Sequence, residues 1–444
     1  MAKKIFSAFF IFLLVFVSVF TPITSYAYEP TGIDLTAKAG MLVSMDTGEI
    51  LFEKNLDEKV YPASITKIMT ALIMLESDKF DPEAKVKINK ACLDKVLGTG
   101  LSVSLLEEGE ELTQLDLLYT VLLSSYGDCT YLAAEIFGGD YESFVDKMNA
   151  KAKELGLTGT HYSNPVGLHE EETYTTARDT YILTKHALKH ELFKTVTSQS
   201  RYHFETTKGT GRTLSTTNFL LDKNTNYWYQ YASGVKTGFT DAAGRCLVST
   251  ASYNNYNYMC ILFGCTNSTQ RRYDFLETKE LYRWAFNNFS YKEVANSDEP
   301  VSEIPVELSS ETDFVSLYFK EPFVTILPNG ADQSTLVPKT KLIAESVDAP
   351  IKKGDVLGIA EIYYAEKLIG EVDLVAGNNV ERNDVLAIIR AIENFFASDY
   401  MKIVYFVLAA IVVLFILGCI ILNLPKKKRK VRYKPYKSTR NNQD

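Results

Sequence analysis

The feature that most constrains this 444-residue chain is an uncharged apolar run near its C-terminus, over residues 403–424. In a helix that rises 1.5 Å per residue, a run of this length reaches across the roughly 30 Å hydrocarbon core of a bilayer. A cluster of lysines and arginines follows at once, beginning at Lys426. Because basic loops stay on the cytoplasmic side of a membrane, we expect a transmembrane helix over 403–424 and a basic cytoplasmic tail over 425–444.

The N-terminus carries the pattern of a secretory signal. Lys3 and Lys4 precede an apolar stretch over residues 5–20, and Ser25 and Ala27 of Ser25-Tyr26-Ala27 are the small residues of an A-x-A-like cleavage site. We therefore predict a signal peptide over 1–27, and an uncleaved membrane anchor is the alternative. Both ends place the body of the chain outside the cytoplasm. The sequence thus predicts a single-pass protein of the cell membrane that is tethered through its C-terminal helix.

The charges between these two ends argue against a nucleic-acid partner. The chain holds 47 Lys and Arg against 55 Asp and Glu, and nine of the basic residues lie in its last 20 positions. The exported body is therefore strongly acidic, whereas a protein that binds a phosphate backbone gathers lysine and arginine on its surface. The sequence predicts no contact with nucleic acid.

The cysteines and histidines predict neither a disulfide framework nor a metal site. Of the six cysteines, Cys419 lies in the expected transmembrane helix, which leaves an odd number outside it and no Cys-x-x-Cys pair. Isolated buried thiols are the simpler interpretation, Cys129 among them. Of the five histidines, only His186 and His190 share a helical spacing. Ala187 rather than Glu follows the first, so the zinc-peptidase pattern His-Glu-x-x-His is absent.

Changes in hydrophobic period divide the exported body into two parts. A first strand pair is expected over 38–54, and apolar residues recur at helical spacing from Ser64 onward. Residues 112–195 are mostly helical in pattern. Strand patterns return at 232–237, 246–253 and 256–264. This order of a strand pair, a helical block and a closing set of strands predicts one α+β domain over 35–290.

A second, smaller unit is expected over 300–380. Turn sequences separate its short alternating segments, which lie at 314–319, 323–327 and 356–364. This pattern predicts a small all-β domain. An apolar stripe at helical spacing then predicts an amphipathic helix over 384–398, beside the membrane.

Two short motifs carry the chemistry. Ser64 and Lys67 are three residues apart at the start of the predicted helix, so the lysine amine can reach the serine hydroxyl, which is a weak nucleophile without a base. Lys236-Thr237-Gly238, near the end of a predicted strand, offers a charge and a hydroxyl for a carboxylate. Alone, each motif is weak, since a serine can simply cap a helix. Their order in the chain matches the serine enzymes that recognise penicillin.

Several longer strings extend this match. They are YPASITKIMT at 61–70, HYSNPVGL at 161–168, YTTARD at 174–179, GVKTGFT at 234–240 and AG at 243–244. With them, most of 35–380 resembles the serine-type D-alanyl-D-alanine carboxypeptidases, which are low-molecular-mass penicillin-binding proteins. The resemblance implies a serine β-lactamase/DD-peptidase-like α+β domain, in which helices pack on an antiparallel sheet. A small all-β domain and the C-terminal transmembrane helix would follow it.

The resemblance also implies an activity, the removal of the terminal D-alanine from peptidoglycan stem pentapeptides through an acyl-enzyme on Ser64. Lys67 would be the base, and Ser125 of a middle motif would help to move the proton. Backbone N–H groups of Ser64 and Phe239 would stabilise the oxyanion. Four residues would bind the substrate: Lys236, Thr237, Gly238 and Phe239. β-Lactams would act as inhibitors, and the family needs no metal or organic cofactor.

The middle motif departs from the family pattern. The family carries Ser-x-Asn on a helix that borders the cleft, whereas Ser125 is followed two positions later by Gly127, which has no side chain. Loss of one polar group that positions a transition state can cost roughly 3 kcal/mol. Tyr126, Asn164 or a water molecule could supply the missing contact.

Three alternatives stay open at this point. A non-catalytic wall-binding or regulatory protein could keep the fold and lose turnover through Gly127. A β-lactamase would need an efficient deacylating base, and no glutamate stands in a motif for that role. A transpeptidase or endopeptidase of the same fold would differ in its acceptor. Arg178 and Arg245 could hold a carboxylate or form surface salt bridges instead.

Overall fold

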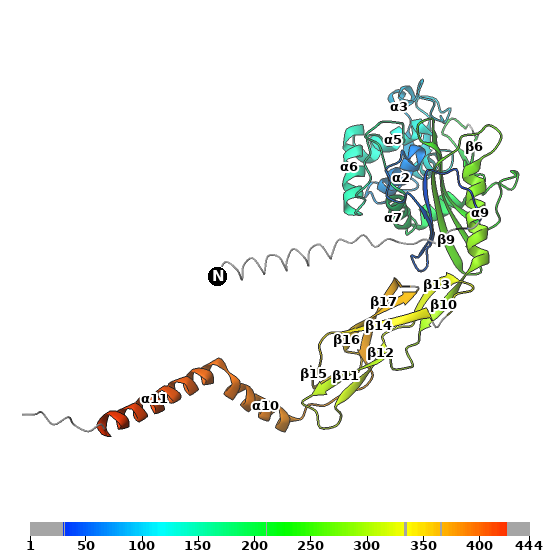
Figure 1. The fold of residues 1–444 in the computed structure, drawn as a ribbon. Coiled ribbons are helices and arrows are strands. Elements are labelled where there is room, and N and C mark those ends of the chain that lie inside the picture. The colour runs from blue at the N-terminus through cyan, green and yellow to red at the C-terminus, as the bar shows by residue number, and fades with distance from the viewer. Residues whose placement is uncertain (1–29, 31, 210, 333–334, 365, 424–444) are drawn as a thin grey trace, which may run out of the picture. The chain divides into compact units, whose positions relative to one another are not determined.

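The structure is a computed structural model that describes residues 30–423 except 31, 210, 333, 334 and 365. The expected signal peptide over 1–27 and basic tail over 425–444 lie outside the described residues. The chain divides into two compact units. Of the described residues, the first unit holds those up to Val294 together with Phe323–Leu336, and the second holds Ala295–Pro322 and those from Val337 onward (Figure 1).

An antiparallel sheet of five strands forms the centre of the first unit, in the order β2-β1-β9-β8-β7 (Figure 1). Its strands are β1 (Ala39–Ser44), β2 (Ile50–Lys54), β7 (Ala232–Thr240), β8 (Gly244–Tyr253) and β9 (Tyr256–Cys265). The predicted first hairpin and closing strands are confirmed, with Met41 opposite Glu53 and Lys236 opposite Val248. β7 ends the sheet order, so among the described residues no strand pairs with its outer edge.

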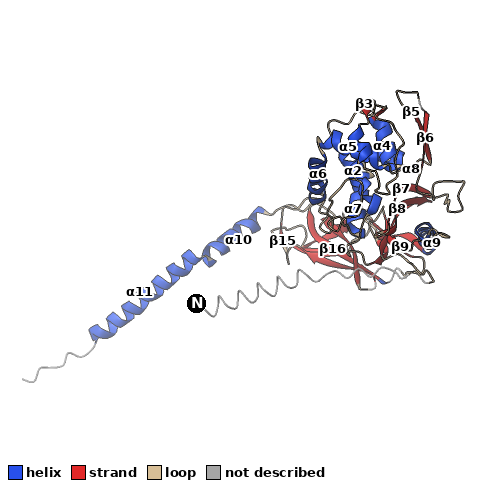
Figure 2. Ribbon diagram, turned by 90° about the horizontal axis from the view of Figure 1, so that it is seen from above, coloured by secondary structure: helices blue, strands red, loops and turns tan. Residues whose placement is uncertain are grey.

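Side chains that alternate between the two faces of this sheet contribute to two hydrophobic cores. In β1, Met41 faces one core and Leu42 the other, and in β9 Ile261 and Leu262 divide in the same way. Successive side chains of a strand point to opposite faces, so strands that are apolar throughout must be covered on both sides. Helix α9 (Tyr273–Asn288) covers one face and a block of helices covers the other (Figure 2).

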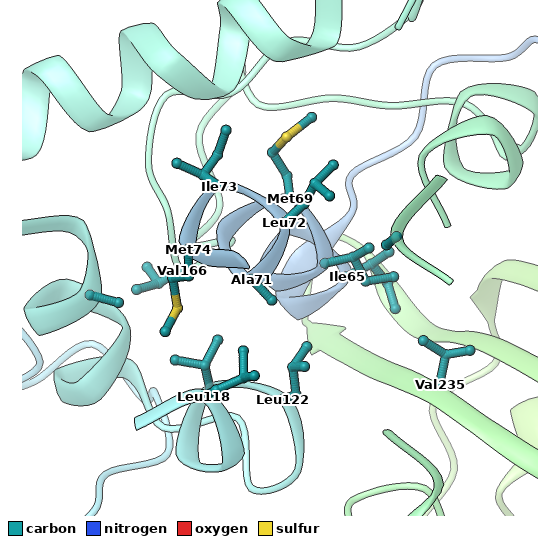
Figure 3. Close-up of a cluster of buried hydrophobic side chains, with 14 of the residues drawn as sticks. Ile65, Met69, Ala71, Leu72, Ile73, Met74, Leu118, Leu122, Val166 and Val235 are labelled. Atoms are coloured by element: carbon teal, nitrogen blue, oxygen red, sulfur yellow. The ribbon is translucent and has the colours of Figure 1, made fainter. Parts of the chain in front are cut away.

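The helical block has α2 at its centre. Its members are α2 (Lys67–Leu75), α3 (Lys90–Asp94), α4 (Gln114–Leu122), α5 (Gly127–Gly138), α6 (Tyr141–Glu154), α7 (Ala177–Ala187) and α8 (Glu191–Ser198). The sequence encodes several starts, as at α4, where Thr113 and Asp116 form a capping box. Every α2 residue from Lys67 to Met74 is buried. Figure 3 shows Met69 and Leu72 of α2 in the same cluster as Leu118 of α4.

Two-stranded ribbons complete the first unit. They are β3 (Lys85–Lys87) with β4 (Glu111–Thr113), β5 (Arg201–Glu205) with β6 (Gly211–Ser215), and β10 (Phe289–Ala295) with β13 (Phe323–Pro328). The sequence placed β13 inside the 300–380 domain. In the structure its segment groups with the first unit, because Ile326 is buried in the same core as Phe275 of α9.

The second unit holds a six-stranded sheet in the order β14-β16-β17-β12-β11-β15. Its strands are β11 (Ser302–Glu307), β12 (Phe314–Phe319), β14 (Leu336–Leu342), β15 (Val347–Asp348), β16 (Val356–Tyr364) and β17 (Lys367–Ala376). The strands predicted at 314–319 and 356–364 are found. Val315, Leu317 and Leu374 are fully buried between neighbouring strands of this unit, so it has a core of its own.

Two helices end the described chain. α10 (Asp384–Ala397) begins at Asn383, whose side chain accepts from the N–H groups of Val385 and Leu386. Ala387 is its only buried residue among those described, and its apolar side chains, including Ile392 and Phe395, are exposed. α11 (Asp399–Asn423) is long and apolar enough to cross a membrane and buries none of its residues.

Candidate active site

Ser64 and Lys67 meet within one helical turn. Ser64 lies in a short 3-10 helix (Ala63–Thr66), and Lys67 is the first residue of α2. The Nζ of Lys67 lies 3.0 Å from the Oγ of Ser64, which is a hydrogen-bonding distance. Lys67 is fully buried, whereas Ser64 lines an open cleft. The structure thus brings the two side chains together, as their spacing predicts.

The surroundings of Lys67 favour a neutral amine. Burial lowers the pKa of Lys67 well below its ordinary value, and the positive charge of Lys236 lowers it further. Its Nζ also lies 2.7 Å from the backbone oxygen of Val166, to which it donates. A neutral amine that is oriented by one hydrogen bond can accept a proton from the neighbouring hydroxyl.

Asn164 holds the loop that supplies this carbonyl oxygen. Its Oδ1 accepts from the N–H groups of Gly167 and Leu168, at 2.8 and 2.9 Å. Its Nδ2 donates to Leu168 O and to Glu170, both at 2.9 Å. The amide is therefore fully used inside the loop. Asn164 thus does not supply the contact missing at Gly127, as the sequence had allowed, and it holds the loop instead.

Two glycines let neighbouring segments approach the turn before Ser64. A Cβ at Gly167, where φ is +78°, would lie 1.8 Å from the backbone oxygen of Ala63. A Cβ at Gly238 would lie 2.9 Å from the backbone oxygen of Pro62. Side chains do not fit at such distances, so both positions require glycine. Ala63 itself has φ of +47°, a strained conformation that these packed neighbours hold next to Ser64.

Lys236 and Thr237 come from the edge strand β7. Lys236 is buried, donates from Nζ to the backbone oxygen of Thr237 at 3.0 Å, and has its pKa lowered to about 7 by burial. The Oγ1 of Thr237 donates to Oγ1 of Thr217 at 2.6 Å and lines the cleft. A negatively charged group in the cleft would restore the charge on Lys236, because a buried ammonium is stabilised by a nearby anion.

Ser125 lies in the loop between α4 and α5. The family motif implied a position on a helix, so this expectation is not met. The φ of Ser125 is +62°, which few non-glycine residues adopt. The Oγ is buried, the residue lines the cleft, and no hydrogen-bond partner for Oγ lies among the described residues. A buried hydroxyl without a partner costs about 1–3 kcal/mol, so this atom is poised to gain from a ligand.

At Gly127, the space for a side chain is already occupied. A Cβ there would lie 2.9 Å from Cδ1 of Leu101 and 3.0 Å from Cγ1 of Val96. The Gly127 N–H donates to the backbone oxygen of Ser102 at 2.8 Å, which fixes the loop that carries Leu101. Leu101 itself lines the cleft. The sequence reading missed Leu101, because its closeness to Gly127 depends on this loop and on no motif.

The cleft has a volume of about 330 Å³ and is lined by Ser64, Leu101, Ser125, Thr237 and Gly238, whereas the buried Lys67 and Lys236 are not among its lining residues. Its remaining lining is mostly polar and cationic: Thr216, Thr217, Phe219, Phe239, Arg245 and Arg272. Arg245 packs over the ring of Phe239 at 4.1 Å. Arg272, which the sequence reading missed, pairs with the buried Asp274 at 2.7 Å. Arg178 instead forms an exposed pair with Asp57 and takes no part in the cleft.

The cysteines are all free thiols, as expected. Burial raises the pKa of Cys92, Cys246 and Cys260 to about 12. Burial also raises the pKa of Cys129, close to Ser125, far above its ordinary value. These thiols are inert packing groups, because the nucleophilic form is the thiolate.

Comparison with known proteins agrees with this arrangement. Residues 24–267 match the family described as D-alanyl-D-alanine carboxypeptidase. Residues 289–382 match the family described as penicillin-binding protein 5, C-terminal domain. The carboxypeptidase DacF of Bacillus subtilis is 30% identical over 347 residues, which cover 78% of this chain and 86% of the relative. DacC of Escherichia coli is 30% identical over 374 residues, 82% of this chain and 90% of the relative.

A solved structure shows the same layout of domains. Penicillin binding protein 5 from Haemophilus influenzae is 28% identical and covers 79% of this chain and 99% of its own, with a TM-score of 0.63. The predicted fold class is confirmed, and neither a β-lactamase nor a non-catalytic protein is favoured. The chain belongs to the D-alanyl-D-alanine carboxypeptidase family, serine-type peptidases of the low-molecular-mass penicillin-binding type.

Proposed function

We propose that this protein removes the terminal D-alanine from peptidoglycan stem pentapeptides, with Ser64 as the nucleophile and Lys67 as its base. The observation that carries the proposal is the 3.0 Å contact between the Ser64 Oγ and a buried lysine amine whose pKa is strongly lowered. A neutral Lys67 takes the hydroxyl proton as Oγ attacks the carbonyl carbon of the penultimate D-alanine.

The attack places negative charge on the carbonyl oxygen. We assign its stabilisation to the backbone N–H groups of Ser64 and Phe239. The close packing of Gly238 against Pro62 supports this pairing, since it holds the end of β7 beside the Ser64 turn. The scissile C–N bond then breaks, the D-alanine amine takes up a proton, and an ester to Ser64 remains.

The substrate's terminal carboxylate is assigned to the cationic end of the cleft. Lys236 and Thr237 lie next to each other on the edge strand, and the Thr237 hydroxyl lines the cleft. A bound carboxylate keeps Lys236 protonated. Arg245 and Arg272 line the same cleft and add positive charge to it. An arginine can hold a carboxylate with two parallel hydrogen bonds.

Ser125 is assigned to proton transfer between Lys67 and the leaving amine. Its buried Oγ, which has no hydrogen-bond partner within the described part of the chain, and its place in the cleft lining support this role. A water molecule then attacks the ester carbonyl, the acyl product leaves, and Ser64 regains its proton. β-Lactams would acylate Ser64 by opening their ring in the same way. No step requires a metal or an organic cofactor.

We assign the protein to the outer face of the cell membrane, with α11 as its membrane span. The length and apolar composition of α11 support the span, and the basic residues after it support a cytoplasmic C-terminus. α10 presents Ile388, Ile392 and Phe395 as an exposed apolar face, which suits the interface of a bilayer.

The test uses the full chain solubilised in detergent and an acylated Lys-D-Ala-D-Ala peptide. Release of D-alanine by the wild-type chain, and its loss in Ser64→Ala, is the expected result. Ser163→Ala is a matched control, because its buried Oγ lies in the neighbouring loop and lacks a partner among the described residues. A folded wild-type chain that releases no D-alanine would contradict the proposal.

A further inference from the structure

The histidine pair that the sequence reading set aside meets a carboxylate from a distant part of the chain. The Nε2 of His186 lies 2.8 Å from Oε1 of Glu76, and the Nε2 of His190 lies 3.4 Å from the same oxygen. All three ligand atoms lie within 4.8 Å of one another. The residues are 110 and 114 positions apart in sequence from Glu76, so no local motif could reveal the cluster.

The backbone holds these three residues from three helix ends. Glu76 is the residue that ends α2, His186 lies in the last turn of α7, and His190 precedes the first residue of α8. α2 contacts both α6 and α7, and these helices lie close together in both views (Figures 1 and 2). The side chains are only 23–31% exposed, so little freedom must be lost to bring the ligands together.

The electrostatics of this place favour a cation. The C-terminal ends of α2 and α7 both lie at the cluster and carry partial negative charge, against the partial positive charge of one N-terminus, that of α8 at His190. A third C-terminal turn, that of α6, supplies Lys151, which pairs with Oε2 of Glu76 at 2.8 Å. Lys151 also pairs with Glu154 at 2.7 Å. Glu154 therefore balances the lysine charge and leaves Oε1 of Glu76 available to the two histidines.

We propose that Glu76, His186 and His190 form a binding site for a borderline divalent cation, with Zn²⁺ as its natural occupant. Two imidazole nitrogens and one carboxylate oxygen are a ligand set that zinc uses, with water in the fourth position. The metal would take the place of the hydrogen bonds to Oε1 and would tie the end of α2 to the α7–α8 turn. Because Lys67 begins α2, the site would brace the helix that carries it, at a distance from the cleft.

The test titrates Zn²⁺ into the full chain in detergent, after chelation and removal of the chelator. We expect saturable binding of one equivalent and a rise in Tm, as for any ligand that binds only the folded state. His186→Ala and His190→Ala should each weaken Zn²⁺ binding at least about tenfold. His203→Ala is the matched control, because His203 lies on β5 and hydrogen-bonds Thr213 instead.

Co²⁺ provides a second readout that does not depend on stability. The wild-type chain and His203→Ala should show the visible absorption of a low-coordinate cobalt site, and both ligand variants should lose it. If a ligand variant unfolds before titration, Glu76→Gln replaces it, since glutamine keeps the side-chain size and removes the charge. Zn²⁺ binding that is absent in the wild type, or unchanged in the ligand variants, would overturn the proposal. Neither outcome depends on D-alanine release.

Discussion

Leu101 fills the space that a side chain at Gly127 would need. The two residues belong to different segments, and the hydrogen bond from the Gly127 N–H to Ser102 keeps them together. The buried carboxylate of Asp128 fixes the same loop by accepting from the N–H and the hydroxyl of Ser104. The departure from the family's Ser-x-Asn pattern is therefore built into the cleft wall.

This relationship predicts that Gly127→Asn alone harms the protein. The new side chain must displace Leu101 or Val96, and overpacking of this kind costs about 1–3 kcal/mol. We expect a lower Tm and slower labelling by a fluorescent penicillin. The double variant Leu101→Ala/Gly127→Asn should recover much of the lost stability, because the alanine removes the clash. A Gly127→Asn chain as stable as the wild type would contradict the steric argument.

The two buried lysines predict a bell-shaped dependence of kcat/KM on pH. Lys67 must be neutral to act as a base, so kcat/KM falls as pH drops through its lowered pKa. Lys236 must be protonated to bind a carboxylate, so kcat/KM also falls as pH rises through about 7. In the complex the bound carboxylate keeps Lys236 protonated, so kcat should persist to higher pH than kcat/KM. Lys236→Arg, which cannot lose its charge, should move the alkaline limb upward; an unmoved limb would contradict the assignment.

Burial of Lys236 predicts a conflict between stability and activity. Its folded-state pKa of about 7 lies below the ordinary lysine pKa of 10.5, so below pH 7 the folded state carries the full cost of a buried charge. Lys236→Met should therefore raise the free energy of unfolding at pH 7 by about a few kcal/mol and abolish D-alanine release. The gain should shrink as pH rises from 7 toward 10.5. Denaturant unfolding near pH 7 and near pH 10.5 measures this gain in the free energy of unfolding. A gain that does not change with pH would contradict the burial of a charged lysine as its cause.

The hydrogen bonds of the Asn164 loop predict that Asn164→Ala impairs acylation more than it impairs stability. Asn164→Ala frees the loop whose Val166 oxygen orients Lys67. We expect penicillin acylation to slow at least about tenfold. Asn149→Ala is the matched control, because its amide also makes two backbone hydrogen bonds, to Tyr162, without touching Lys67. Equal acylation rates in the two variants would show that the loop does not position the base.

Local patterns predicted the parts of the fold that local forces decide. The hairpin around Asp46 and the strand at 314–319 follow from alternation and turn residues, and both are found. The contact of Ser64 with Lys67 follows from helical spacing alone. The place of β13 did not follow, because its alternation is the same whichever sheet it joins. Only the burial of Ile326 beside α9 decides that it groups with the first unit.

The parts of the site that sequence reasoning missed depend on contacts between distant segments. Arg272 enters the cleft beside a distant segment, because its guanidinium packs over the ring of Phe219 and its backbone N–H donates to the hydroxyl of Tyr227. Leu101 enters because its loop is bonded to α5, where Gly127 donates to Ser102 and Asp128 accepts from Ser104. Nothing in the sequence around Arg272 indicates that its side chain lines the cleft.

The most direct test of the mechanism is the intact mass of the detergent-solubilised chain after reaction with a penicillin, followed by peptide mapping. One adduct with the mass of the intact drug, on the peptide that contains Ser64, is the expected result, and Ser64→Ala should carry none. An adduct on any other residue, or an adduct that persists in Ser64→Ala, would contradict the assignment of Ser64 as the nucleophile.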